Sequence, residues 1–282
     1  MRHGEFRAMG TRVEAWTADQ AGFEATVEWF DEVEEVCSRF RPNSELSSVN
    51  GDSRHRVPVS TLLHEVLTHA REMRSLTGGL VDAGLGAAVI AWGYDRTFDE
   101  VAGLSEPPPF VPHEIGWDLE PGHLVREPGT MIDLGGVGKG WACDVAVDSG
   151  LALVVSAGGD IRSAHPETVV PIFDPWGEHA AEVALGSGAL ATSSTANRRW
   201  KVGDAEAHHL IDPRTRRPAD SPILTATVIA STAAAAEAGA KTVLLLGEDG
   251  LSWADAQDWI RAALIVWHDG SVFATSGMEL AA

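Results

Sequence analysis

The stretch from Met131 to Asp144, MIDLGGVGKGWACD, constrains the chain more than any other, because four of its glycines fall within six residues. It predicts a short apolar strand, a glycine-rich turn and a helix start. Glycines let a ligand approach the backbone, and N–H groups at a helix start attract anions such as phosphate. Lys139 adds a positive charge, while Asp133 and Asp144 point to a metal or a hydrogen-bonded base as well. A tight turn without a ligand is the alternative.

Two standard phosphate-binding motifs do not fit this stretch. A P-loop requires Ser or Thr after Gly-Lys and a glycine upstream, but Gly140 follows Lys139 and Asp133 occupies the upstream position. The dinucleotide fingerprint Gly-x-Gly-x-x-Gly, counted from Gly136, meets Trp141 where its last glycine belongs. Both nucleotide-binding folds are therefore disfavoured.

Composition bounds the class of protein. With 282 residues, 44% hydrophobic and 22% charged, the chain is typical of a globular protein with one large or two modest domains. A net charge of −20 argues against nucleic acid as a partner. No apolar run is long enough to span a bilayer, and the N-terminus lacks the apolar core of a signal peptide, so we expect a cytoplasmic location. Cys37 and Cys143 are expected to be reduced core residues.

Hydrophobic periodicity predicts alternating strands and helices. The expected elements are strands at 5–17, 151–156 and 225–231, helices at 21–37, 60–76, 232–246 and 252–263, and a closing hairpin at 263–275. Less regular segments are a loop or short turn at 37–50, a loop with a short strand pair at 99–130, and short strands at 168–202 with a turn at Pro175. Irregular, hairpin-rich connections favour an α/β (α+β) fold with mixed, partly antiparallel sheets and flanking helices over a doubly wound sheet.

Several side chains outside the glycine-rich stretch are candidates for chemistry. Phe40 between two arginines is either an aromatic platform for a planar ring or part of an ordinary exposed loop. Asp82 lies in an apolar stretch, where an unpaired charge would be costly. His209 with Asp212 could be a base and its orienting partner, although a structural histidine is more common.

Taken in order, motifs from Ala8 to Gly247 resemble those of the ApbE-type flavin transferases, the FAD:protein FMN transferase family. Met9 lies in Ala-Met-Gly-Thr, where the family's Met lines the flavin pocket. Phe40 falls where the family packs a residue on the flavin ring. Leu80-Val81-Asp82, followed by Trp-Gly-Tyr, resembles the block Phe-Asp-x-Thr…Trp-Gly-Phe, and the resemblance implies that these three residues bind the cofactor.

The later motifs extend the resemblance. The stretch from Asp133 matches Asp-Leu-Gly-Gly-x-x-Lys-Gly-x-x-x-Asp, which implies that Asp133 and Lys139 contact FAD and that Gly136 offers its carbonyl to magnesium. Residues 158–161 match Gly-Gly-Asp-Ile. Residues 209–215 match His-x-Ile-Asp-Pro-x-Thr, which implies a catalytic role for His209 and an FAD contact for Ile211.

The sequence departs from this family pattern at the second part of the metal site. The family's Ala-Asp-x-x-x-Thr, whose Asp and Thr bind magnesium, is here Ala-Glu-x-x-x-Lys with Glu237 and Lys241. Glu237 can ligate a hard cation, but a charged lysine cannot. Either Glu237, Gly136 and phosphate hold Mg²⁺ alone, or Lys241 partly replaces it; a surface ion pair is the plainer alternative. In addition, Arg216 stands where the family has glycine.

The resemblance implies a reaction in which FAD is split, FMN is joined through a phosphoester to a Thr or Ser of a target flavoprotein, and AMP leaves. It also implies one domain over residues 1–282, with two intertwined subdomains and a central FAD cleft. The boundary between the subdomains cannot be read from the sequence. Two other functions stay open from the sequence. One is an FAD pyrophosphatase that gives FMN and AMP, and the other is a non-catalytic FAD-binding or carrier protein.

Overall fold

The computed structural model describes the chain in three stretches, residues 1–108, 116–173 and 179–278. The chain divides into two compact units, unit 1 with residues 1–30, 139–196 and 220–282, and unit 2 with residues 31–138 and 197–219. Each unit is assembled from segments that are far apart in the sequence, so no local change in composition marks a boundary. That the whole chain acts as one domain stays a prediction, and the turn expected at Pro175 lies outside the described residues.

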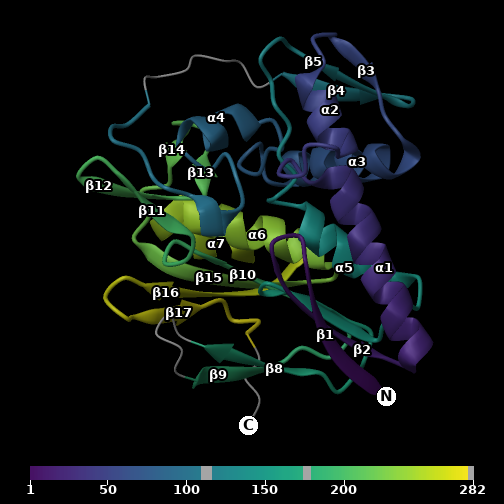
Figure 1. Ribbon diagram of the computed structural model, residues 1–282. Coiled ribbons are helices and arrows are strands. Elements are labelled where there is room, and N and C mark those ends of the chain that lie inside the picture. The colour runs from purple at the N-terminus through teal and green to yellow at the C-terminus, as the bar shows by residue number, and fades with distance from the viewer. Residues whose placement is uncertain (109–115, 174–178, 279–282) are drawn as a thin grey trace. The chain divides into compact units, whose positions relative to one another are not determined.

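Unit 1 is built on a sheet that has eight strands within the described ranges, with every neighbouring pair antiparallel (Figure 1). The strands, in their order across the sheet, are β1 (Arg2–Ala8), β2 (Thr11–Thr17), β6 (Val154–Ala157), β7 (Asp160–Ser163), β10 (Gly188–Ser194), β15 (Ile223–Ala230), β16 (Ile260–Trp267) and β17 (Val272–Ala274). The other elements of this unit are β8 (Val169–Phe173), β9 (His179–Ala184), α5 (Gly138–Asp148), α6 (Ala233–Leu246), α7 (Gly250–Asp255) and a 3₁₀ turn at Gly247–Asp249.

Strand β15 is buried along its whole length because both faces of the sheet are covered there. Helix α6 packs against β10 and β15, and a Cβ added to Gly239 of α6 would lie 3.0 Å from Val228 Cγ1. Ile229, the next residue, points to the opposite face and packs with Leu190 and with Val183 of the β8–β9 hairpin. Double burial explains why this segment is a continuous apolar run in the sequence.

Unit 2 consists of short helices and small antiparallel sheets, which pair in the orders β3-β5-β4, β11-β12 and β13-β14. Its elements are α2 (Glu45–Gly51), β3 (Arg56–Pro58), α3 (Thr61–Leu76), α4 (Gly86–Ala91), a 3₁₀ turn at Phe98–Glu100, β4 (Trp117–Glu120), β5 (His123–Arg126), β11 (Arg199–Val202), β12 (Ala205–His208), β13 (Ile211–Asp212) and β14 (Arg217–Pro218). Helix α1 (Gln20–Cys37) contains residues of both units.

The mixed α/β fold with antiparallel sheets and helices is confirmed. The helices expected at 60–76 and 232–246 are α3 and α6, and both begin at a side-chain cap: Ser60 Oγ accepts the N–H of Leu63, and Thr232 Oγ1 that of Ala235. The short strand pair expected within 99–130 is β4–β5. Cys37 and Cys143 are free and buried, as expected.

Two expectations at the N-terminal end were wrong. Residues 5–17 form the β1–β2 hairpin and not one strand, because Met9 and Gly10 turn the chain with φ of 51° and 69°. The alternating pattern continues through the turn because both strands place the same face on the core. The segment expected as a loop or short turn at 37–50 contains most of helix α2, whose N-cap Ser44 accepts the N–H of Ser47 at 3.0 Å.

The helix expected at 252–263 was also wrong. Helix α7 ends at Asp255, and strand β16 begins at Ile260. The apolar residues of this segment have helical spacing, but from Ile260 the chain pairs along β15. Hydrogen bonding to that neighbouring strand outweighs the local pattern and makes the segment a strand. The closing hairpin is confirmed as β16–β17, with Gly270 at φ 86° in the turn.

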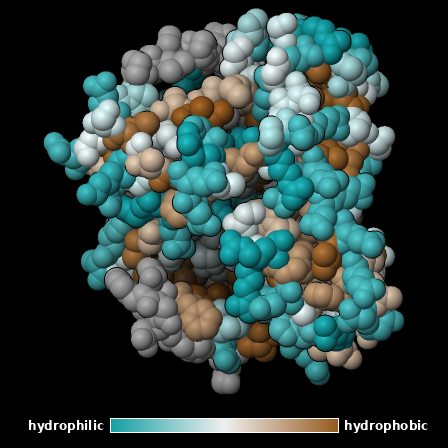
Figure 2. Space-filling view, in the orientation of Figure 1, coloured by the Kyte–Doolittle hydropathy of each residue, from teal (hydrophilic) through white to brown (hydrophobic). Residues whose placement is uncertain are grey.

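No helix in the described part of the chain is both long enough and apolar enough to cross a membrane. Hydrophilic residues cover most of the face shown in Figure 2, in line with the net charge of −20. The cytoplasmic location stays a prediction.

Candidate functional site

Lys139, Glu237 and Lys241 form a buried ion cluster in unit 1. Lys139 Nζ lies 2.6 Å from Glu237 Oε1 and 2.7 Å from Asp160 Oδ2. Lys241 Nζ, one turn further along α6, lies 2.9 Å from the same Glu237 oxygen, while Glu237 Oε2 accepts the N–H of Gly140 at 3.1 Å. The Glu237 side chain is 2% exposed and the lysine side chains 12% and 15%. The Glu237–Lys241 contact is therefore not a surface ion pair.

The electrostatics of this cluster fix its charge state. Burial lowers the pKa of Lys139, but Asp160 and Glu237 together raise it by more, so it lies above its usual value. Burial raises the pKa of Glu237, but the two lysines bring it below its usual range. For Asp160, burial and the nearby Glu237 charge raise the pKa, and Lys139 opposes them only in part. Lys139 and Glu237 are therefore both ionised at neutral pH.

In the glycine-rich stretch around the start of α5, two backbone N–H groups are already bonded to carboxylates. Gly135 donates its N–H to Asp133 Oδ1 at 2.7 Å, and the Gly140 N–H is taken by Glu237. Gly140 is needed for helix packing, since a Cβ there would lie 2.7 Å from the backbone N and Cα of Ala234. The helix start is confirmed, whereas the expected strand before it is a single parallel bridge between Leu85 and Met131.

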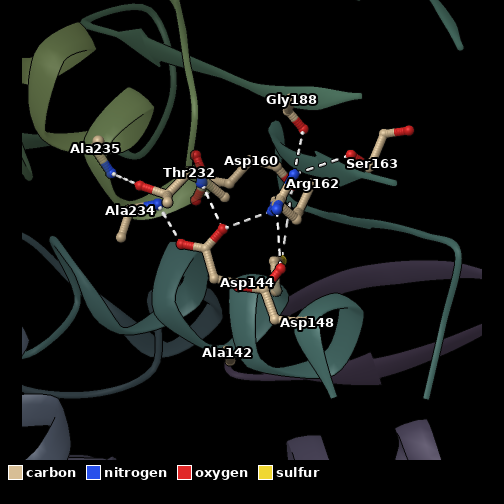
Figure 3. Close-up of polar contacts among 12 residues, drawn as sticks. Ala142, Asp144, Asp148, Asp160, Arg162, Ser163, Gly188, Thr232, Ala234 and Ala235 are labelled. Atoms are coloured by element: carbon tan, nitrogen blue, oxygen red, sulfur yellow. Dashed lines mark hydrogen bonds and ion pairs between the residues drawn. The ribbon is translucent and has the colours of Figure 1, made fainter. Parts of the chain in front are cut away.

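Asp144 ends the glycine-rich motif and caps α6 (Figure 3). Its Oδ1 accepts the N–H of Ala233 at 2.7 Å, and its Oδ2 accepts that of Ala234 at 3.0 Å. Arg162 of β7 lies against the same carboxylate, with Nε 3.3 Å from Oδ1, and also contacts Asp148 at 2.8 Å. From the sequence, Asp144 pointed to a metal or a hydrogen-bonded base, whereas in the structure its carboxylate binds two N–H groups at the start of α6.

Asp133 is bound by Arg39 in unit 2. Arg39 Nε donates to Asp133 Oδ2 at 2.7 Å, and the guanidinium carbon lies 4.0 Å from the centroid of the Phe40 ring and 5.0 Å from that of Tyr94. Within the described part of the chain, the buried Arg39 Nη2 makes no hydrogen bond. Sequence reasoning placed a cationic neighbour beside Phe40 but did not name Arg39 as a site residue.

Phe40 and Ile211 belong to one hydrophobic cluster of unit 2. Ile211 is buried there with Tyr94 and Trp200, and Phe40 packs against them. The ring centroids of Phe40 and Tyr94 are 5.4 Å apart, and those of Tyr94 and Trp200 are 5.6 Å apart. The structure therefore brings together Phe40, which the resemblance assigned to the flavin ring, and Ile211, which it assigned to an FAD contact. An aromatic cluster beside an arginine suits a planar, polar ring system.

Asp82 is held by three donors inside unit 2. Its Oδ1 accepts the N–H of Gly84 and the indole N–H of Trp117, both at 2.7 Å, and its Oδ2 lies 3.1 Å from Arg74 Nε. The buried charge is thus paired, as its cost in an apolar setting requires. Leu80–Val81 precede it, half-buried and buried. A contact of residues 80–82 with FAD stays a prediction.

His209 follows strand β12 directly and is half-buried in unit 2. The carboxylate of Asp212 is engaged by Arg214, whose Nη2 lies 2.7 Å from Oδ2 and whose Nε lies 2.9 Å from Oδ1. The neighbouring His208 is buried, with Nε2 3.0 Å from the carbonyl oxygen of Ala219. The catalytic role of His209 and its orientation by Asp212 stay predictions.

Met9 and Arg216 have left-handed backbone conformations, with φ of 51° and 56°. Met9 lies in the β1–β2 turn, at the end of the sheet where β6 turns into β7 and Asp160. Arg216, which stands where the family pattern has glycine, adopts a conformation that glycine reaches without strain. A non-glycine residue in this region is strained, which points to a role for the Met9 side chain.

The described residues do not fit a magnesium site. In the part of the chain that the structure describes, no group of three or more His, Cys, Asp and Glu residues could hold a metal ion. Both oxygens of Glu237 already accept hydrogen bonds from Gly140 and the two lysines. The charged Lys241 cannot ligate, although it stands at the family's threonine position. Gly136 is half-buried in the turn before α5.

This chain is similar in sequence to several known proteins. A FAD:protein FMN transferase of Rhodobacter capsulatus is 31% identical over 240 residues, which are 77% of this chain and 45% of that protein. The chain thus spans less than half the length of that relative. A second FAD:protein FMN transferase, from Vibrio cholerae, is 26% identical over 278 residues, which are 85% of this chain and 78% of that protein.

Solved structures show the same fold. The ApbE protein of Thermotoga maritima superposes with a TM-score of 0.82 at 24% identity, covering 98% of this chain and 97% of that one. The flavin transferase ApbE of Vibrio cholerae gives a TM-score of 0.78 at 24% identity, with the same coverage. The sequence profile of the ApbE family matches residues 9–264. With that match over most of its length, the chain belongs to the ApbE family.

Proposed function

We propose that this chain is a FAD:protein FMN transferase, which acts on FAD and on a target flavoprotein that presents a Thr or Ser. The family match over residues 9–264 carries the proposal, supported by relatives that share this name. In the reaction, the acceptor hydroxyl oxygen attacks the phosphorus on the FMN side of the pyrophosphate. The bond from that phosphorus to the bridging oxygen breaks, and AMP leaves with that oxygen.

The flavin ring is assigned to Phe40 and Ile211, which belong to one aromatic cluster in unit 2, where Phe40 is half-buried. Asp133, held by Arg39 beside that cluster, is assigned to a polar edge of FAD. Lys139 is ionised at neutral pH and is assigned to the phosphates. Met9 and residues 80–82 complete the proposed contacts on the basis of the family pattern.

His209 is the proposed general base, because histidine ordinarily titrates near neutral pH and is the most frequent residue in this role. It would take the proton of the attacking hydroxyl as the phosphoester forms. It is half-buried, so its ring is shielded from water only in part.

The transfer itself is tested with purified protein, FAD and a target domain that carries a Thr or Ser acceptor. We expect the intact mass of the target to rise by one FMN phosphoester, and a target with Ala at the acceptor to stay unchanged. FMN and AMP released without a target would identify a pyrophosphatase. FAD bound but unchanged under all cation conditions would identify a carrier, and either result would contradict the proposal.

The role of His209 is tested with His209→Ala. We expect transfer to fall by about 10²-fold or more, the usual contribution of a general base, while FAD affinity stays within about twofold. His208→Gln is the matched control, since the buried His208 contacts a backbone carbonyl. It should transfer normally per folded molecule, whereas normal transfer by His209→Ala would make His209 structural.

A further inference from the structure

Two of the three lysines in the chain end in one buried cluster. Lys139 and Lys241 reach the same oxygen of Glu237, and only Lys201 lies on the exposed side of a strand. Lysine is rarely buried unless it is paired, and this chain has 41 acidic against 21 basic residues. Convergence of two ammonium groups on one carboxylate oxygen therefore indicates a specific arrangement.

The two ammonium groups are not equally neutralised. Lys139 lies within 2.7 Å of two carboxylates, those of Asp160 and Glu237. Within the described ranges, Lys241 has Glu237 as its ion-pair partner and shares it with Lys139. An ammonium group has three N–H donors, and Lys241 donates to Glu237 Oε1, so it keeps donors for a further anion. Its side chain is 15% exposed, which leaves it within reach of a ligand.

The Lys241 ammonium group is also fixed in position. Glu237 and Lys241 are four residues apart on α6, whose start is capped by Asp144 and Thr232. Glu237 is itself anchored to α5 through the N–H of Gly140. A charge held in advance by two helices needs little reorganisation when an anion binds.

A divalent cation does not fit the same place. Both Glu237 oxygens are engaged, and the Lys241 ammonium 2.9 Å from Oε1 would repel a second positive charge. Threonine at position 241, as in the family pattern, would leave that position open to a cation.

We propose that the Lys241 ammonium, held by Glu237, takes the place of the divalent cation in neutralising the phosphates of FAD, so that this chain binds FAD without magnesium. The inference rests on the proposed function and deepens it. The proposal predicts that a chelator does not change the affinity of the wild-type protein for FAD. It also predicts that Lys241→Thr needs magnesium to bind FAD.

The test measures FAD affinity by calorimetry, without any target protein, in EDTA and in excess Mg²⁺. Wild type should bind FAD with the same Kd in both conditions, within about twofold. In EDTA, Lys241→Thr should bind FAD about tenfold or more weakly than wild type, because it lacks the charge-assisted hydrogen bond to phosphate. Mg²⁺ should restore much of that loss. Lys201→Thr, at the exposed lysine, is the matched control and should behave as wild type.

Each outcome decides a different claim. A wild-type Kd that weakens tenfold in EDTA, or a Lys241→Thr variant that binds like wild type without Mg²⁺, overturns the lysine replacement and leaves the transferase proposal intact. A wild type that binds no FAD overturns both. Thermal melts accompany the titrations, and the wild-type comparison decides the inference even where Lys241→Thr does not fold.

Discussion

At the scale of single residues, Met9 has a conformation that its side chain does not favour. A two-residue hairpin turn with φ of 51° and 69° suits Asn-Gly, and this chain has Met-Gly. The left-handed region costs about 1 kcal/mol for an ordinary side chain. The β1–β2 hairpin carries this cost, which asparagine at position 9 would reduce.

We therefore expect Met9→Asn to change stability and binding in opposite directions. The free energy of unfolding should rise by about 0.5–1 kcal/mol, because asparagine tolerates the turn conformation. The affinity for FAD should fall, because the side chain assigned to the flavin is lost. Urea unfolding and FAD titration measure the two effects. Met9→Leu keeps the strain and should not gain stability; FAD affinity unchanged in Met9→Asn would remove Met9 from the site.

At the scale of elements, the contact between α5 and α6 positions the ion cluster, and Gly140 makes this contact possible. A Cβ there would lie 2.7 Å from the backbone of Ala234, which cannot move aside as a flexible side chain would. Lys139 and Glu237 come from these two helices, so the spacing between the helices sets the length of their ion pair.

We expect Gly140→Ala to lower the free energy of unfolding by about 1–3 kcal/mol, the usual cost of overpacking a close contact. Gly51→Ala is the control, because a Cβ at this residue of α2 meets nothing within 4 Å. It should be neutral or slightly stabilising, since alanine is the better helix former. Equal stability of the two variants in urea would contradict the packing role of Gly140.

Asp144 should make the stability of α6 dependent on pH. Burial raises the pKa of Asp144 from 3.8 to about 6, although two backbone N–H groups and Arg162 oppose the rise. A raised pKa in the folded state means that the stabilisation is complete below pH 3.8 and is lost as the pH rises through 6.

Relative to Asp144→Asn, which cannot titrate, the wild type should gain about 1 kcal/mol between pH 7 and pH 5. Denaturant melts at the two pH values measure this difference directly. A difference between the two proteins that is flat across this range, or that falls with acid, would show that the carboxylate is ionised throughout and that the caps outweigh burial.

At the scale of the whole molecule, each unit contains one buried cysteine, Cys37 in unit 2 and Cys143 in unit 1. Burial raises the pKa of Cys37 to about 12 and that of Cys143 as well, so neither thiol is reactive in the folded protein. The chain passes between the units four times, at residues 30–31, 138–139, 196–197 and 219–220. Because both units are made of several segments of the chain, we expect them to unfold in one step.

Alkylation in rising denaturant, followed by peptide mass spectrometry, should show both cysteines becoming reactive at one midpoint. Neither should react without denaturant. Separate midpoints for Cys37 and Cys143 would show that the units unfold independently. Labelling of either thiol in the native protein would contradict its burial.

Local patterns predicted much of the secondary structure and several site residues. Helices α3 and α6 follow from capping side chains and apolar spacing, and β15 from its apolar run. The start of β16 at Ile260 could not be foreseen, because pairing with β15 outweighs the helical spacing of the apolar residues there. The candidates Phe40 and Ile211 came from motifs, and their meeting in one cluster became visible only in the fold.

The sequence alone determined the family pattern, the charge balance and the position at which this chain departs from its relatives, since these depend only on residue identity and order. The tertiary structure decided what that departure does. It placed Lys241 and Lys139 on one oxygen of a buried Glu237 and used the Gly140 N–H to hold the other oxygen. Whether two charges four residues apart form a surface pair or a buried cluster depends on what else packs there, and here the packing includes a helix from a distant part of the chain.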